Sequence, residues 1–175
     1  ANGRKQKLYI KDSEMYSSPT ISLEALTASI IIDIVEGRKV AIFDVPGAYL
    51  HAGMPDNQRT LMVLRGDFVD IMCQVNPDYE KFVSYAGKQK VLYLHLLRAL
   101  YGCIQSSLLW YELYSKTLKD MVFVINEYDR CVANKMIKGN QCTICWYVDD
   151  NKVSHMCDDV IRDVLKEIDW EAVRL

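Results

Sequence analysis

The chain contains few residues that interrupt regular structure. Its 175 residues include only four prolines and eight glycines, and no repeat, low-complexity stretch or linker stands out. This length is enough for one packed core but too short for two large domains, so we expect one domain rather than a complete enzyme. No apolar run reaches the roughly 18 residues of a membrane span, and residues 1–6 lack the apolar stretch of a signal peptide. We therefore expect a soluble, intracellular protein without a membrane partner.

An excess of positive charge is also missing. The 21 Lys and Arg residues are outnumbered by 23 Asp and Glu residues, which gives a net charge of −2. This balance argues against a free-standing nucleic-acid binder, because such domains are usually basic. The charge is uneven, however: basic residues crowd positions 4–11 and acidic residues dominate positions 149–171. A basic rim around an acidic centre is compatible with this distribution.

The cysteines and histidines suggest no catalytic or metal-binding motif. The six cysteines lie in apolar runs or helical patterns, so we interpret them as reduced core residues rather than a disulfide framework. Cys142 and Cys145 have zinc-ligand spacing, but residues three apart in a strand point to opposite faces and no second pair follows. The three histidines have no partner motif, and the sequence contains neither a Ser-His-Asp order nor a phosphate-binding glycine loop.

Hydrophobic periodicity predicts a mixed succession of helices and strands. Helices are expected between Ser22 and Gly37, over residues 104–118 and from about residue 158, with a helical turn at residues 67–73. Strands are expected over residues 39–45, 61–65, 91–96, 131–137, 141–148 and 151–155, the last three forming consecutive hairpins. This order predicts an α+β domain in which helices cover one face of an antiparallel sheet.

Three carboxylates lie at the ends of two predicted strands. Asp149 and Asp150 follow the apolar run 142–148, and Asp44 lies at the end of strand 39–45. Such a group suggests a two-metal site of the kind that polymerases use. The alternative is ordinary turn chemistry, because Asp and Asn tolerate turn geometry and bond to their own backbone.

Four motifs, in this order, resemble the reverse transcriptase of copia-type LTR retrotransposons. They occupy residues 44–51, 99–111, 129–131 and 147–150 and include Leu-Tyr-Gly, Trp-Tyr, Asp-x-Cys and Tyr-Val-Asp-Asp elements. The resemblance covers about residues 20–168. It implies that residues 1–175 form a single partial reverse transcriptase domain, with the antiparallel-sheet palm of a right-hand polymerase over about residues 38–168. The fingers would be incomplete, and the thumb and RNase H absent.

The resemblance implies RNA-directed DNA polymerase activity, that is, addition of dNTPs to a primer 3′-hydroxyl. Asp44 and Asp149 would ligate two Mg²⁺ ions, with Mn²⁺ as a substitute, and Asp150 would complete the triad. The Val45 carbonyl is a further candidate ligand of the nucleotide-side metal. Expected partners are an RNA or DNA template with its primer, dNTPs, and the integrase and RNase H segments of a polyprotein. By analogy with the family, the location is a cytoplasmic virus-like particle.

Two further residues match substrate-binding positions of the family. Tyr49 corresponds to the aromatic residue that lies under the incoming sugar and excludes a 2′-hydroxyl; without the family match, a core aromatic is the alternative. Gln105, with Ser106, matches a stretch that approaches nucleotide and template, and its alternative is a solvated amide at a helix start. Tyr101 and Gly102 belong to the same surface. Trp110 and Tyr111 are interpreted as packing residues.

The departures from the family leave other functions open. Residues 104–108 lack the two basic residues and the proline that are common there, and the basic fingers residues that hold the triphosphate are not matched. We therefore expect very weak or undetectable processive synthesis. One alternative is a non-catalytic relic that retains at most nucleic-acid or partner binding. Another is an RNA-recognition module, which requires exposed strand aromatics beside basic residues; residues 91–94 offer one aromatic and, from the sequence, no basic partner.

Overall fold

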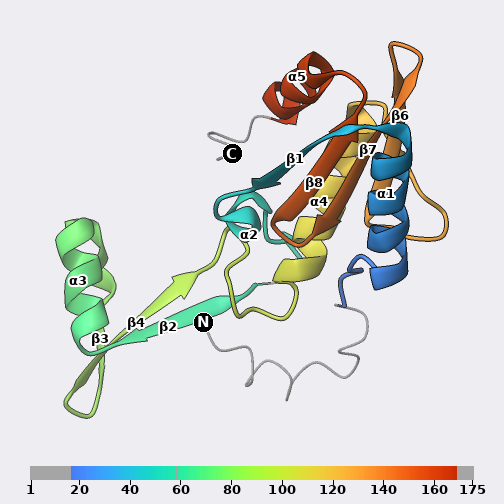
Figure 1. Ribbon diagram of the computed structural model, residues 1–175. Helices are drawn as coiled ribbons and strands as arrows, with labels where there is room; N and C mark the ends of the chain where they lie inside the picture. Colours follow the sequence, from blue (N-terminus) through green and yellow to red (C-terminus); the bar gives the residue numbers. More distant parts are fainter. Residues whose placement is uncertain (1–16, 58, 169–175) are drawn as a thin grey trace.

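The computed structural model describes residues 17–57 and 59–168 (Figure 1). The helices are α1 (Leu23–Glu36), α2 (Ala48–His51), α3 (Asp67–Val75), the 3-10 helix η3 (Pro77–Phe82), α4 (Ser106–Asp120) and α5 (Asp158–Ile168). The strands are β1 (Lys39–Asp44), β2 (Leu61–Arg65), β3 (Ser84–Ala86), β4 (Gln89–His95), β5 (Val124–Ile125), β6 (Val132–Ile137), β7 (Asn140–Tyr147) and β8 (Asp150–His155). The predicted α+β class is confirmed. The basic cluster at residues 4–11 and the C-terminal residues 169–175 lie outside the described residues.

The larger sheet is antiparallel and has the strand order β1-β8-β7-β6-β5. Lys138 and Gly139, with φ of 50° and 79°, form the tight turn between β6 and β7. Val148 and Asp149 connect β7 to β8, and Val148 has a φ of 57°. The predicted hairpins over residues 131–155 are therefore confirmed, with each boundary within one residue.

Helices cover both faces of this sheet, so the expectation that they lie on one face is wrong. On one face, α4 and α5 pack over a core that includes Trp110, Ile144 and Val153. On the other face lies α1, where Ser29 contacts Cys145 at 3.4 Å between Oγ and Sγ. Residues 142–146 of β7 are all buried because alternate side chains meet different helices. In the sequence, the apolar run at residues 142–148 was the signal that this strand is buried on both faces.

The ends of α1 follow the predicted capping. Ser22 Oγ accepts a hydrogen bond from Ala25 N at 3.2 Å, and Gly37 ends the helix with a φ of 67°. The buried side of the helix is polar, however, and carries Ser29 and Asp33. Several apolar residues of the helix point outward: Ile31, Ile34 and Val35 are 55, 74 and 78 % exposed.

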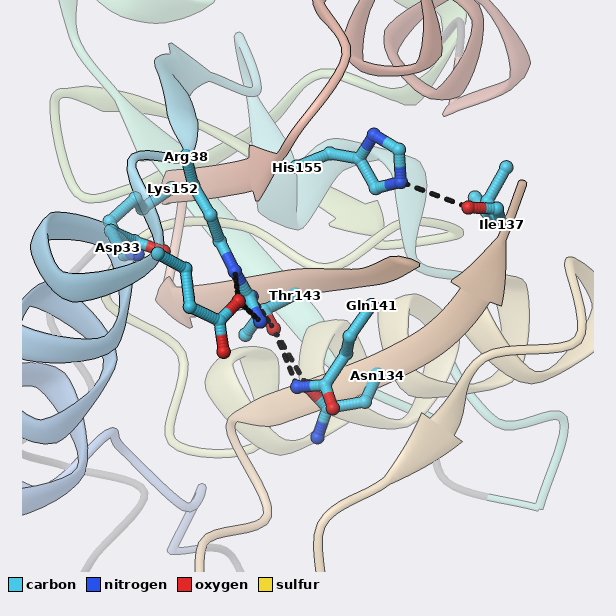
Figure 2. Close-up of polar contacts among 9 residues, drawn as sticks. Asp33, Arg38, Asn134, Ile137, Gln141, Thr143, Lys152 and His155 are labelled. Carbon is cyan, nitrogen blue, oxygen red and sulfur yellow. Dashed lines mark hydrogen bonds and ion pairs between the residues drawn. The ribbon is translucent and has the colours of Figure 1, made fainter. Parts of the chain in front are cut away.

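A polar network lies between α1 and the larger sheet (Figure 2). Arg38 Nη1 donates to Thr143 Oγ1 at 3.1 Å, and the Thr143 hydroxyl donates to Asn134 Oδ1 at 2.9 Å. Gln141 Nε2 donates to both Asn134 Oδ1 and Thr143 Oγ1, at 2.8 and 3.0 Å. Because the Arg38 side chain is almost completely buried, these bonds, together with the ion pair to Glu36, offset the desolvation of its charge.

The smaller sheet has the order β2-β4-β3 and extends away from the larger sheet together with α3 (Figure 1). Strands β2 and β4 were predicted, but β3 was not, because its three residues are too short for a periodic signal. The helical turn predicted at residues 67–73 is the start of the longer helix α3.

The cysteines are all free, as predicted. Cys142 belongs to the core under α4 and α5, whereas Cys145 contacts α1, so the two side chains lie on opposite faces of the sheet. Burial raises the pKa of Cys131 to about 12 and that of Cys142 to about 11. These thiols are therefore protonated and unreactive at neutral pH.

None of the described helices has the length and apolar character to cross a membrane.

Candidate active site

The strand register brings the three predicted carboxylates to one corner of the larger sheet. In the ladder between β1 and β8, Asp44 lies directly opposite Asp150. Asp149 occupies the adjoining turn, and its carbonyl accepts a hydrogen bond from Val45 N at 3.1 Å. Residues separated by more than 100 positions in the sequence are thus held together by backbone pairing.

Trp110 of α4 fixes the turn that carries Asp149. Its indole Nε1 donates to the Val148 carbonyl at 2.7 Å, and its ring stacks on Tyr114 with a centroid distance of 5.2 Å. Val148 has a positive φ, which is costly for a β-branched residue and persists only when the surroundings impose it. The interpretation of Trp110 as a packing residue is confirmed by its burial. Its hydrogen bond adds a second role, the support of the Asp149 turn.

Two tyrosines lie beside the carboxylates of Asp149 and Asp44. The rings of Tyr49 and Tyr101 have a centroid distance of 4.4 Å, and the Tyr101 hydroxyl lies 3.4 Å from Asp149 Oδ2. Partial burial raises the pKa of Tyr101, and the negative charges of Asp149 and Asp44 raise it further. Partial burial, followed by the charge of Asp149, likewise raises the pKa of Tyr49. Both phenols are therefore protonated at neutral pH and form a wall of the site.

The contact between Tyr101 and Asp149 could not be inferred from the sequence. The two residues belong to different motifs and are 48 positions apart. A local signal existed, because Gly102 directly follows Tyr101 and has a φ of 92°, which marks a sharp turn. Ser106 fixes this turn: its hydroxyl donates to the Leu100 carbonyl at 2.8 Å and accepts from Leu100 N at 3.1 Å.

Asp150 has different surroundings from Asp149. It lines a hollow between α1 and the sheet, together with Ile42, Tyr147 and Lys152. Among the described residues, neither Tyr49 nor Tyr101 forms a hydrogen bond with it. Asp149 therefore lies beside Tyr101 and Asp150 lines the hollow on the side of α1, whereas Asp44 is paired with Asp150 in the strand ladder and its charge acts on Tyr101.

The donor atoms at this corner suit Mg²⁺. Within the described ranges, no group of three or more His, Cys, Asp or Glu side chains is placed to hold a metal ion. Mg²⁺, however, is commonly bound by one or two carboxylates, with water and substrate phosphate oxygens completing its shell. Asp44 and Asp149 would supply these carboxylates. The Val45 carbonyl accepts a hydrogen bond from Ala48 N at 3.2 Å and Val45 is buried, so its role as a metal ligand stays a prediction.

Gln105 lies at the start of α4 with its side chain buried. Its Nε2 donates to Thr60 Oγ1 at 3.0 Å, and its Oε1 is buried without a hydrogen-bond partner among the described residues. This bond joins the start of α4 to the residue before β2. The amide is not solvated, and a contact with nucleotide or template stays a prediction.

The Asp-x-Cys motif has a structural role here. Asp129 Oδ2 accepts hydrogen bonds from Ser22 N and Oγ, both at 2.8 Å, and Asp129 Oδ1 accepts from Cys131 N at 2.9 Å. The motif therefore ties the first turn of α1 to the start of β6. Because both carboxylate oxygens of Asp129 accept hydrogen bonds within the fold, we assign the motif to folding rather than chemistry.

His155 is also structural, in agreement with the absence of a histidine motif. It is fully buried at the end of β8. Its Nδ1 accepts from Cys157 N at 3.0 Å, and its Nε2 lies 3.1 Å from the Ile137 carbonyl (Figure 2).

No protein-family model, curated protein or solved structure matches this chain.

Proposed function

We propose that this chain is the palm-centred part of an RNA-directed DNA polymerase of the copia retrotransposon type, which adds dNTPs to a primer 3′-hydroxyl. The observation that carries the proposal is the strand register, in which Asp44 lies opposite Asp150 and beside the turn that contains Asp149. The Tyr-Val-Asp-Asp motif at residues 147–150 and the tyrosine pair beside Asp149 support the same function.

The proposal assigns a role to each group at the corner. Asp44 and Asp149 hold the divalent ions, and Asp150 adds negative charge from the side of α1. Two Mg²⁺ ions bound there would stabilise the charge on the phosphate oxygens during in-line displacement. Tyr49 lies under the sugar of the incoming nucleotide and excludes a 2′-hydroxyl, and Tyr101 packs against it.

A non-catalytic relic is the second candidate. It is favoured by one observation, namely that no three acidic, cysteine or histidine side chains in the described part of the chain are placed to hold a metal. A relic would keep the fold, because the packing of Trp110 and the strand register do not depend on metal. Metal binding therefore separates the two candidates.

The first test is a titration with Mn²⁺ and Mg²⁺, followed by thermal unfolding. At a metal concentration ten times the dissociation constant, binding stabilises the folded chain by about 1.4 kcal/mol and raises the melting temperature by about 3–6 °C. Asp44→Asn and Asp149→Asn should each remove this shift. Asp163→Asn, an exposed change on α5, is the matched control and should retain it. An equal response in all four proteins would refute the metal site and favour the relic.

Primer extension with dNTPs and rNTPs is the second test. Weak extension that requires Asp149, and that accepts rNTPs more readily in Tyr49→Ala, would support the polymerase proposal. Metal binding without Asp149-dependent extension under any condition would support the second candidate, a non-catalytic relic that still binds metal.

A further inference from the structure

The smaller sheet has one face covered by a helix and one face that is open except at Val91. Helix α3 packs on one side, where Asp70 forms an ion pair with Lys90 of β4. Along β2, half-buried residues on the α3 side alternate with exposed residues on the other side. Strand β4 follows the same alternation from Leu92, which is fully buried, to Tyr93, which is 58 % exposed. Val91, which pairs with Arg65 and shares the face of Tyr93, is buried and marks the covered end of that face. The open face, as we call it, consists of Leu61, Val63, Arg65, Tyr93 and His95.

Tyr93 lies at the centre of the open face, with basic side chains on two sides. It pairs directly with Val63, while Arg65 pairs with Val91, two residues away on β4, and is thus a diagonal neighbour of Tyr93. His95 follows two positions later on the same face. Neither Arg65 nor His95 forms an ion pair or a side-chain hydrogen bond with another described residue. The expectation that this aromatic lacks a basic partner is therefore wrong, because the partner comes from the neighbouring strand.

The acidic residues around the smaller sheet lie outside its strands. Residues 57–66 and 84–111 contain no Asp or Glu. The acidic residues of this region lie on α3 and η3, namely Asp67, Asp70, Asp78 and Glu80. Two of them are paired with Lys90 and Lys81. The positive charge of Arg65 on the open face is therefore not neutralised within the described residues.

We propose that the open face binds a single strand of nucleic acid, with one base stacked on Tyr93 and a backbone phosphate near Arg65. A tyrosine on a sheet offers a flat surface to any base, and an unpaired arginine attracts the phosphate backbone. Leu61 and Val63 extend the apolar surface beside the ring. The inference rests on the proposed polymerase function only in naming the bound strand as template.

The test measures fluorescence anisotropy of a short labelled deoxythymidine strand with the whole chain, in EDTA and without dNTPs. Tyr93→Ala should weaken binding about tenfold, because stacking on one aromatic is lost. Tyr93→Phe retains the ring and should bind like the parent. The matched control is Tyr85→Ala: Tyr85 is also exposed, but it pairs with Lys90, whose side chain lies on the α3 side. Tyr85→Ala should not change the affinity.

Arg65→Gln adds an independent measurement. It should weaken binding and reduce the dependence of affinity on salt by about 0.7 in the log–log slope, the value for one phosphate of a single strand. Lys81→Gln on η3, which is also exposed, should leave the slope unchanged.

Two results would overturn the inference: no binding by the parent chain, or equal losses in Tyr93→Ala and Tyr85→Ala. Because EDTA removes divalent ions, the outcome does not depend on the carboxylate corner. Binding that depends on Tyr93 in a chain without a metal response would refute the polymerase proposal and retain the open face. A metal response without single-strand binding would refute the open face as a binding site and retain the polymerase proposal.

Discussion

The two sheets differ in how completely they are covered. In the larger sheet, residues 142–146 of β7 are all buried between α1 and α4, and the adjoining turn carries Asp149. In the smaller sheet, β2 alternates between half-buried and exposed residues, and α3 covers one face only. A sheet packed on both faces can hold carboxylates in a fixed position, whereas a sheet with one open face leaves strand side chains available for contact. The candidate active site therefore lies on the sheet that is packed on both faces, and the candidate binding surface lies on the sheet that is covered on one face.

The largest expected difference between the two regions concerns their aromatic residues. Trp110→Ala should lower the free energy of unfolding by about 3–5 kcal/mol, because it opens a cavity in the core and removes the bond to Val148. Phe68→Ala on α3 should change it by less than about 0.5 kcal/mol, because Phe68 is 68 % exposed. Urea unfolding of both variants measures the difference. Similar losses would show that the smaller sheet is packed as tightly as the larger one.

Ion pairs provide the next comparison. Asp33 and Lys152 pair in the nearly buried space between α1 and β8, so Asp33→Ala leaves an uncompensated charge and should cost about 3 kcal/mol. Asp70 and Lys90 pair on the surface of the smaller sheet, and the hydrogen bond to Asp70 raises the pKa of Lys90. Asp70→Ala should have no measurable effect on unfolding. A large effect of Asp70→Ala would contradict this assignment of buried and exposed pairs.

Alkaline pH should give the smallest difference. The pKa values of Cys131 and Cys142 are raised to about 12 and 11 by burial, whereas the unfolded thiols titrate near 9. The stability that these thiols contribute is fully present below the unfolded pKa and is lost as pH rises through the folded pKa. Between about pH 8 and pH 10, the free energy of unfolding should fall by about 1 kcal/mol for each thiol.

A double variant, Cys131→Ala with Cys142→Ala, is the control for this pH effect and should lack that part of the decrease. Cys73, which is half-buried on α3 of the smaller region, provides the comparison: Cys73→Ala should retain the full decrease. If Cys73→Ala flattened the profile instead, the alkaline loss would come from the smaller region.

The sequence predicted the hairpins of the larger sheet because their signals are local. A Lys-Gly pair at residues 138–139 sets the tight turn, and the apolar runs on either side define the strands. Ser22 and Gly37 likewise bound α1 through contacts with nearby backbone groups. The orientation of α1 was not predictable in this way. Its many Ile residues indicate an inward apolar face, yet Asp33 faces inward because Lys152, far away in the sequence, pairs with it.

The same distinction applies to the candidate site. The residue types and motifs of the sequence determined which side chains are candidates, namely Asp44, Asp149, Asp150 and Tyr49. Only the tertiary structure decided that Asp150 lies on the side of α1 and that Tyr101 contacts Asp149. Turn and cap signals act over a few residues, so a single sequence displays them. The neighbours of a carboxylate are instead set by strand register and helix packing between distant segments, which a single sequence does not display.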